Sequence, residues 1–284
     1  MISPRTTSRL LMAPGLAWLL GLMVIPCLFI FVLIFFERGT YGGINWSAPT
    51  LENITRAFDP LYLQIFLDSA RIAFITTSLS LFIGYPAAYA ISKTSERHQT
   101  SLLFFAMLPF WTNYLIRTYA WIVLLNPAGL INGLLLRTGL IVSPLPLLYN
   151  EFAVIMGLVY NYTPFVILAI YSSLQRMDKS LPEASRDLGA SAMTTFLRIT
   201  LPLTAAGVAA GAVFVFVLSI GNFVTPNLLG GKKFQMVGNL IYDQFLTARD
   251  WPFGATLSAL LIGIMMLLLM VKAIASNRAG ARHA

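Results

Sequence analysis

The chain has 284 residues, of which 57% are hydrophobic and 11% are charged, and its mean hydropathy is +0.76. Soluble domains have about 25% charged residues, so this composition excludes an ordinary soluble protein and predicts a membrane protein. The formal net charge of +8 does not indicate a nucleic-acid partner, because most cations fall in short segments beside apolar runs. The single cysteine, Cys27, excludes an intrachain disulfide and a cysteine-based metal or haem site.

Six apolar stretches are each long enough to cross a bilayer core as a helix, which takes about 20 residues. The first is too long for the apolar part of a cleavable signal peptide, so we expect the mature protein to retain it. In chain order, the predicted spans cover residues 10–36, 66–92, 102–125, 152–174, 203–224 and 253–275. We predict one all-helical membrane domain over residues 1–284, with both termini on the same side.

Positive charge predicts the orientation, because short cytoplasmic segments are enriched in Lys and Arg. On one face of this topology lie Arg5, Arg9, Lys93, Arg97, Arg176, Lys179, Arg186, Arg198, Lys272, Arg278 and Arg282. The opposite segments are longer and hold only Arg38, Arg56, Arg137, Lys232, Lys233 and Arg249. We therefore predict that both termini and the segment 176–202 are cytoplasmic.

Other signals concern the ends and contacts of the predicted spans. Short apolar stretches around Leu134 and Leu147, broken by Pro and Gly, predict an interfacial or re-entrant piece between spans three and four. Gly207 and Gly211 form a GxxxG pair that favours close helix packing. The tripeptide Asp250-Trp251-Pro252 predicts the N-cap and first turn of the last span.

The segment between spans four and five carries signals for two short helices. Ser180 followed by Glu183 predicts a capping box, with Pro182 in the first turn. Gly189 predicts a left-handed stop, and Ser191 predicts the N-cap of a second helix. We expect a compact helix–glycine–helix knuckle, and the alternative is a solvated loop on the membrane surface.

The spacing within this segment is also distinctive. From Glu183 the sequence reads Glu-Ala-Ser, then Gly189 after three residues, Ile199 after nine more, and Leu201-Pro202 after one more. This pattern resembles the EAA loop of ABC-importer permeases, and Ser185 in place of the second alanine is its one departure. The phrases GYPAAYAIS (84–92), LPFWTNYLIRTYAW (108–121) and YSSLQRMDKSLPEASRDLGAS (171–191) are similar to the spermidine/putrescine branch of that family.

The resemblance implies a type I (MetI-like) permease core in a bacterial inner membrane, in a subunit that is not an enzyme. It implies that this chain has no catalytic residue, metal site or cofactor, because ATP and Mg²⁺ bind a partner ATPase. The implied partners are a second homologous permease, two ATP-binding subunits that dock on the EAA loop, a periplasmic substrate-binding protein and membrane lipid. The residues implied in the docking are Glu183, Ala184, Ser185, Arg186, Asp187, Gly189, Ile199, Leu201 and Pro202.

Polar side chains inside the spans are candidates for a substrate path, because burying them in hydrocarbon is costly. The candidates are Trp111, Asn113, Tyr160, Asn161, Tyr162, Asn222 and Asn227. Aromatic faces can bind cations, although interfacial aromatic belts explain some of these residues equally well. For Arg117 we expect a structural ion pair with Glu151 or Asp68 rather than a substrate contact.

The resemblance implies a polyamine cargo, with one departure. Related polyamine permeases tend to have acidic residues in the segment that here reads IGNFVTPNLLGG (220–231), and this chain has Asn222 and Asn227. Carboxylates suit a polycation better than amides do, which leaves an opine, an amino-acid derivative or 4-aminobutyrate as alternatives.

Two other classes of function are rivals. An ion-coupled secondary carrier would need intramembrane acids or paired broken helices, and the sequence offers no convincing case of either. A membrane enzyme would need a converging catalytic set, whereas the only histidines are His98 and His283.

Overall fold

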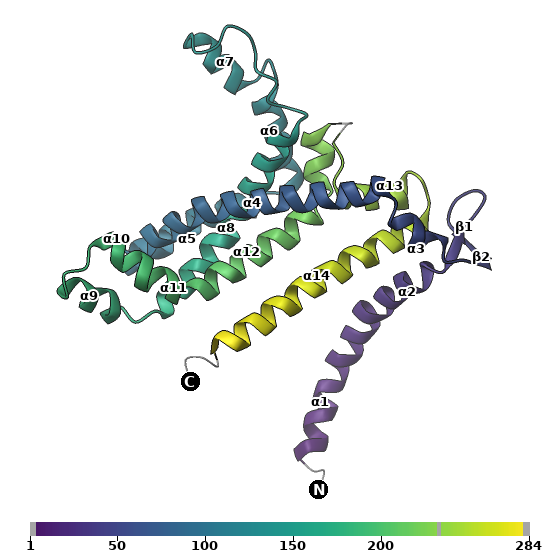
Figure 1. Ribbon diagram of the computed structural model, residues 1–284, viewed down its shortest axis with the longest axis horizontal. Coiled ribbons are helices and arrows are strands. Elements are labelled where there is room, and N and C mark those ends of the chain that lie inside the picture. The colour runs from purple at the N-terminus through teal and green to yellow at the C-terminus, as the bar shows by residue number, and fades with distance from the viewer. Residues whose placement is uncertain (1–3, 232–233, 281–284) are drawn as a thin grey trace. The chain divides into compact units, whose positions relative to one another are not determined.

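The computed structural model describes residues 4–231 and 234–280, with side chains described for residues 12–231 and 234–270. Some residues named in the sequence analysis lie outside the described residues, namely Lys232, Lys233, Arg282 and His283. For Arg5, Arg9, Lys272 and Arg278, the side chains lie outside them. The chain forms two compact units, Met1–Gln64 with Leu240–Ala284, and Ile65–Asn239. Both are built mainly from helices (Figure 1), as the sequence predicted.

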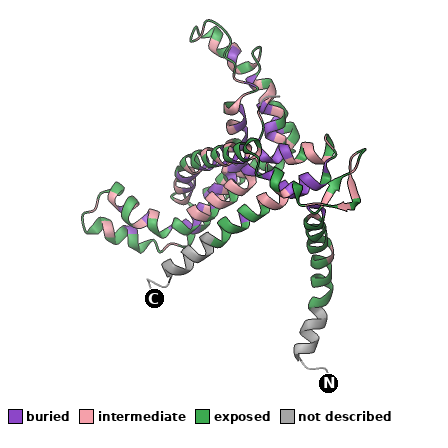
Figure 2. Cartoon of the chain, turned by 45° about the vertical axis from the view of Figure 1, so that its right-hand side comes forward, coloured by how far each residue is buried: buried purple, intermediate pink, exposed green. Residues whose placement is uncertain are grey.

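The first unit begins with a long apolar helix. Its parts are α1 (Pro4–Leu19), the π-helical turn η1 (Leu20–Val24) and α2 (Ile25–Leu33). Exposed residues run along α2 (Figure 2), as expected of a helix that faces lipid. The predicted span is three residues too long at its end. The carbonyl of Phe35 accepts a hydrogen bond from the Thr50 N–H at 2.9 Å, so strand pairing replaces the helix there.

A short β-hairpin follows, which the all-helical prediction did not contain. Strands β1 (Phe36–Arg38) and β2 (Ile44–Pro49) pair antiparallel, and Gly42 and Gly43 form the turn with φ of 92° and 80°. These strands are too short to show an alternating hydrophobic pattern. Helix α3 (Glu52–Ala57) comes next.

The C-terminal part of the first unit contains α13 (Val237–Leu246), which starts in the second unit, and α14 (Trp251–Gly280). The predicted cap of the last helix is confirmed, since Asp250 Oδ1 accepts the Phe253 N–H at 3.2 Å. Asp250 Oδ2 also lies 2.7 Å from Arg56 Nη1. Burial lowers the pKa of Arg56, but hydrogen bonds to Asp250 and Tyr62 outweigh it and raise that pKa above its usual value.

Helix α4 (Pro60–Ser92) starts in the first unit and continues in the second, and it begins six residues before the predicted span. The cause is local, because Asp59 Oδ1 accepts the Leu61 N–H at 2.9 Å and Pro60 fits the first turn of a helix. Helix α8 (Glu151–Arg176) agrees with the predicted fourth span to within two residues at each end.

The predicted third span is wrong as a single helix. It consists of α5 (Glu96–Trp111) and α6 (Tyr114–Leu125), separated at Thr112 and Asn113. Asn113 caps the new helix, because its Oδ1 accepts the N–H groups of the second and third residues that follow it. A short helix, α7 (Leu130–Arg137), follows in the segment predicted to be interfacial or re-entrant.

The predicted fifth span is shorter than expected and is bent at its start. Helix α12 (Ala205–Ile220) follows the segment Ala192–Leu203 across a 65° bend at Thr204. The short π-helix η3 (Pro226–Gly230) comes after it. Among the described residues, five helices are long and apolar enough to cross a membrane, or up to six if this bent pair is one span.

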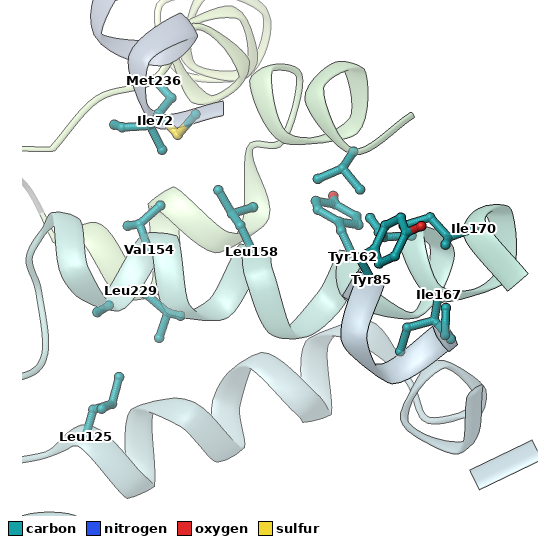
Figure 3. Packing of buried hydrophobic residues seen from close by; sticks show 14 of the residues in the cluster. Ile72, Tyr85, Leu125, Val154, Leu158, Tyr162, Ile167, Ile170, Leu229 and Met236 are labelled. Atoms are coloured by element: carbon teal, nitrogen blue, oxygen red, sulfur yellow. The ribbon is translucent and has the colours of Figure 1, made fainter. Parts of the chain in front are cut away.

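The core of the second unit surrounds α8 (Figure 3), where Val154, Leu158 and Ile170 are fully buried. Helix α12 packs closely against α8, as the GxxxG pair predicted. A Cβ atom at Gly207 would lie 2.5 Å from the Ser173 Cβ, so only glycine fits there without a shift.

Candidate functional site

Residues 176–202, between α8 and α12, form the predicted knuckle, for which we keep that name. Helix α9 (Ser180–Asp187) ends at Gly189, which has φ of 85°. The N–H groups of Gly189 and Ala190 donate to the carbonyls of Arg186 at 2.8 Å and Ser185 at 3.1 Å. This pair of hydrogen bonds is the usual end of a helix at a left-handed glycine, so the predicted stop is confirmed.

The start of α9 differs from the prediction. Ser180 is the first helical residue, the N-cap position is Lys179, and no side chain caps it there. The predicted capping box between Ser180 and Glu183 is therefore wrong. Instead, Asp178 Oδ1 accepts the Ser180 N–H at 2.9 Å, and hydrogen bonds from Ser180 lower the pKa of Asp178.

The second helix of the knuckle, α10 (Ala192–Thr195), is capped as predicted. Ser191 Oγ accepts the Thr194 N–H at 3.2 Å. The two helices are joined by a hydrogen bond of 3.1 Å between the hydroxyls of Ser185 and Thr195, and Thr195 is buried. The knuckle is thus a defined structure and not an open loop.

Most of the predicted docking residues are accessible at the knuckle surface. Glu183, Ala184, Arg186, Asp187, Gly189 and Pro202 are exposed, whereas Ser185, Ile199 and Leu201 are half-buried. Large apolar side chains that the prediction did not include are also exposed, most of all Leu188 at 89% and Met193 at 66%. Exposed apolar side chains beside charged ones are typical of a protein-binding surface.

The knuckle is linked to the helix bundle through Phe196. This residue opens a π-helical turn, η2 (Phe196–Thr200), which leads through α11 (Leu201–Leu203) to the bend at Thr204. The Phe196 ring packs edge-on against Tyr85 at 5.4 Å, and the Tyr85 hydroxyl lies 2.8 Å from Thr204 Oγ1. The knuckle and the bend therefore share one contact on α4.

A second polar cluster lies in the bundle, at the end of α12. Asn222 Nδ2 donates to the Tyr114 hydroxyl at 2.7 Å and to the Tyr162 hydroxyl at 2.6 Å, and its Oδ1 accepts the Thr225 N–H at 2.9 Å. The hydroxyls of Tyr114 and Thr225 are 2.5 Å apart. This amide cluster (Tyr114, Tyr162, Asn222 and Thr225) connects α6, α8 and the chain after α12.

The structure brings together only two of the predicted path residues, Tyr162 and Asn222. Sequence reasoning missed Tyr114 and Thr225, although Tyr114 directly follows the predicted Asn113. The other predicted residues lie elsewhere: Asn113 caps α6, Trp111 is 76% exposed, Tyr160 packs on Trp121, and Asn227 is exposed in η3. Asn161 is buried, and its Oδ1 has no hydrogen-bond partner.

Arg117 does not form the predicted ion pair. Glu151 lies 2.7 Å from Arg71, and Asp68 lies 3.9 Å from the same guanidinium, so Arg71 takes both expected carboxylates. Arg117 is only 8% exposed and donates from Nη1 to the carbonyl of Pro109. Its guanidinium carbon lies 5.5 Å from the centre of the Tyr114 ring, which places a buried cation beside the amide cluster.

The knuckle and the amide cluster lie at opposite ends of α12, because the knuckle leads into its first turn and Asn222 follows its last residue, while Tyr162 lies near the middle of α8. In Figure 1, α9 and α10 extend from one end of this helix pair, and α6 and α7 lie at the other. Among the described residues, no group of three or more His, Cys, Asp or Glu is placed to hold a metal ion. The geometry therefore offers an exposed surface of apolar and charged side chains at one end of α12 and a polar cluster inside the bundle at the other.

Comparison with known proteins gives matches over nearly the whole chain. Residues 7–280 match the family described as binding-protein-dependent transport system inner membrane component. The spermidine/putrescine transport system permease protein PotB of Haemophilus influenzae is 42% identical over 256 residues, which are 90% of this chain and 89% of that protein. PotB of Escherichia coli is 42% identical over 254 residues, which are 89% of this chain and 92% of that protein.

Solved structures show the same fold. A chain of a bacterial ABC transporter that imports the acidic polysaccharide alginate has a TM-score of 0.68 at 16% identity, covering 93% of each chain. A chain of the MetNI methionine ABC transporter has a TM-score of 0.53 at 16% identity, covering 75% of this chain and 95% of that one.

Proposed function

Because the chain belongs to the family of binding-protein-dependent transport system inner membrane components, we propose that it is the permease subunit of an ABC importer that carries spermidine or putrescine. The observation that carries this proposal is the 42% identity to two PotB permeases over about nine tenths of the chain. The subunit spans the inner membrane and forms half of the translocation pathway, and a partner subunit hydrolyses ATP.

The knuckle fits the role of the docking element for that ATPase. It is a closed helix–glycine–helix structure with exposed Leu188 and Met193 at its surface. The knuckle contacts Tyr85 of α4 through Phe196, and Tyr85 contacts Thr204 at the bend before α12. A displacement of the knuckle can therefore move both α4 and this bend. ATP and Mg²⁺ bind the ATPase subunits, and the complete importer contains a second permease and a periplasmic binding protein.

We assign the six-span topology and its orientation to this function. Helix α12, which follows the bend after the knuckle, serves as one span, and α5 and α6 together form another. The knuckle and both termini face the cytoplasm, in keeping with the excess of Lys and Arg on that face. The two compact units then belong to one permease domain over residues 1–284.

The amide cluster lines the substrate path in this proposal. Hydroxyl and amide groups of Tyr162 and Asn222 can exchange their mutual hydrogen bonds for bonds to a polar solute as it passes. The Tyr114 ring adds a face that binds cations. Of the remaining candidates, buried Asn161 has an Oδ1 atom without a hydrogen-bond partner in the same unit.

One observation favours a second class of cargo. Arg117 is a buried cation beside Tyr114, with no carboxylate within 4.0 Å in the described part of the chain. A unit charge of the same sign at about 8 Å would cost roughly 2 kcal/mol at an effective dielectric constant near 20. A solute that also carries a carboxylate, such as an opine, another amino-acid derivative or 4-aminobutyrate, avoids this cost.

Uptake into proteoliposomes that contain the complete importer tests the cargo. The polyamine proposal expects ATP-driven uptake of labelled spermidine or putrescine, and the second candidate expects uptake of labelled 4-aminobutyrate instead. Uptake by this chain alone without ATP would show an ion-coupled carrier and refute both.

Two substitutions at Gly189 test the docking role. A Cβ there meets no atom within 4 Å, so only the left-handed backbone restricts the residue. Gly189→Val should raise the free energy of the folded knuckle by about 1–2 kcal/mol, which lowers the ratio of folded to distorted knuckle by about 5- to 30-fold. Asn tolerates this left-handed conformation. We expect Gly189→Val to lose ATPase subunits on copurification and Gly189→Asn to keep them. Equal copurification by both variants would refute this role.

A further inference from the structure

A cavity of about 220 Å³ lies beside the knuckle, among the ends of three helices. Lys93 approaches it from the end of α4, Lys179 from the turn after α8, and Arg186 from α9. The volume is several times the roughly 30 Å³ that one water molecule occupies in the liquid. The cavity can therefore hold a polyatomic group.

The three cations of this cavity are not neutralised by the protein. Among the described residues, no carboxylate oxygen lies within 4.0 Å of the charged nitrogens of Lys93, Lys179 or Arg186. Glu183 is the one acidic residue in the lining, against three basic ones. Lys93 Nζ is held 5.4 Å from the centre of the Tyr89 ring, which also lines the cavity. The site therefore has a surplus of positive charge.

Helix dipoles do not account for all of this surplus. A cation at a helix C-terminus is stabilised by the partial negative charge there, and α4 and α8 both end at the cavity. Lys93 can interact with the C-terminal end of α4. At the C-terminal end of α8 this role falls to Arg176, whose Nε donates to the Ser172 carbonyl at 3.2 Å and which does not line the cavity. Arg186 lies in the last turn of α9 and can interact with the C-terminal end of that helix, whereas Lys179 stands at the N-cap of α9, where the helix dipole does not stabilise a cation.

We propose that this cavity binds a phosphate group, and that its source is the headgroup of an anionic phospholipid of the cytoplasmic leaflet. The proposal rests on the cytoplasmic orientation given under the proposed function. The cavity lies directly after the last residues of two spans, at the depth of the headgroups, and basic pockets between spans on this face bind anionic lipids. Ser92 and Thr94 also line the cavity, and their hydroxyls donate to the carbonyls of Tyr89 and Ile91 at 2.8 Å.

The bound lipid acts on the knuckle. Arg186 belongs to α9, whereas Lys93 and Lys179 belong to the ends of the bundle helices or the turn after them. A phosphate shared by the three therefore holds α9 against α4 and α8. Membrane composition then influences how firmly the docking element follows the bundle.

The test is native mass spectrometry of the complete importer titrated with phosphatidylglycerol, and with phosphatidylcholine as the zwitterionic control. Each cation lost near a lipid headgroup is expected to weaken binding about fivefold, so Lys93→Gln with Lys179→Gln should weaken phosphatidylglycerol binding about 30-fold. Arg97→Gln removes one charge from an exposed residue outside the lining and should change binding less than about twofold. Soluble glycerol 3-phosphate is titrated in parallel.

Selective retention of phosphatidylglycerol that is lost in the double variant and kept in Arg97→Gln supports the site. Unchanged binding in the double variant, or equal binding of phosphatidylcholine, overturns it. Binding of glycerol 3-phosphate as tight as that of the lipid overturns the lipid source and leaves a site for soluble phosphate. Copurification of ATPase subunits with the wild type and with the double variant shows that the importer is assembled in both. Absence of these subunits from the wild type counts against the proposed function and not against the lipid site.

Discussion

The contact between α8 and α12 predicts the effect of adding one carbon atom at Gly207. In Gly207→Ala, the new Cβ would lie 2.5 Å from the Ser173 Cβ and 2.8 Å from the Ala169 carbonyl oxygen. Non-bonded carbon atoms normally pack at about 3.5–4.0 Å. The neighbouring atoms are a Cβ and a backbone oxygen, neither of which can rotate away. The two helices must therefore separate locally by about 1 Å.

This separation should destabilise the protein. Overpacking a well-packed contact costs about 1–3 kcal/mol, and the better helix propensity of Ala offsets up to about 1 kcal/mol of it. We expect a net loss of about 1–2 kcal/mol for Gly207→Ala. Gly211→Ala is the matched control one turn along the same helix face. Its Cβ would lie 3.4 Å from the Val166 Cα, an ordinary contact, so we expect it to be neutral or slightly stabilising.

Equilibrium unfolding of the purified chain in mixed detergent micelles measures both effects. Adding Ser173→Gly to Gly207→Ala removes the atom at 2.5 Å and should recover part of the stability, because the Ala169 contact remains. The reasoning is refuted if Gly207→Ala is as stable as the wild type, or if Gly211→Ala is destabilised equally.

Two further predictions concern the amide cluster and the cap of α14. Asn222→Leu removes three hydrogen bonds and should lower the free energy of unfolding by about 1–3 kcal/mol. The control Asn227→Leu changes an exposed residue and should alter that free energy by less than about 0.5 kcal/mol. Equal losses in the same unfolding assay would contradict a stabilising role of the amide cluster. Asp250→Asn keeps an oxygen for the Phe253 N–H but loses the ion pair to Arg56, which is 2.7 Å long with the Asp side chain 5% and the Arg side chain 40% exposed. Partial exposure reduces the value of the pair to about 1–3 kcal/mol. Asp250→Ala should lose about 1 kcal/mol more, and a thermal-unfolding series in which the Asn variant matches the wild type would exclude a stabilising pair.

The knuckle was predictable because its signals are local. A left-handed glycine and a serine cap act within four residues, so Gly189 and Ser191 have the expected conformations. The capping box failed because the helix already begins at Ser180, whose N–H donates to Asp178 Oδ1 two residues earlier, so Ser180 does not stand at the N-cap position.

The interruption of the third span was not predictable from apolar length. Residues 102–125 read as one span because hydropathy does not distinguish a helix from a broken one. The break is stabilised by near neighbours in the chain: the carbonyl of Pro109 accepts the Thr112 N–H at 3.3 Å and a bond from Arg117, and Asn113 then caps a new helix. Apolar length alone contains none of these bonds.

The sequence by itself determined the membrane class, the approximate spans, the small-residue contact of α12 and the family resemblance, because each depends on composition or on fixed spacing. The tertiary structure decided which polar groups meet. Asn222 lies 60 residues from Tyr162 and 108 from Tyr114, and Arg71 lies 80 from Glu151. A buried polar group forms its hydrogen bond with the partner that helix packing brings within about 3 Å. Local sequence patterns do not specify this packing, so they cannot predict the partner.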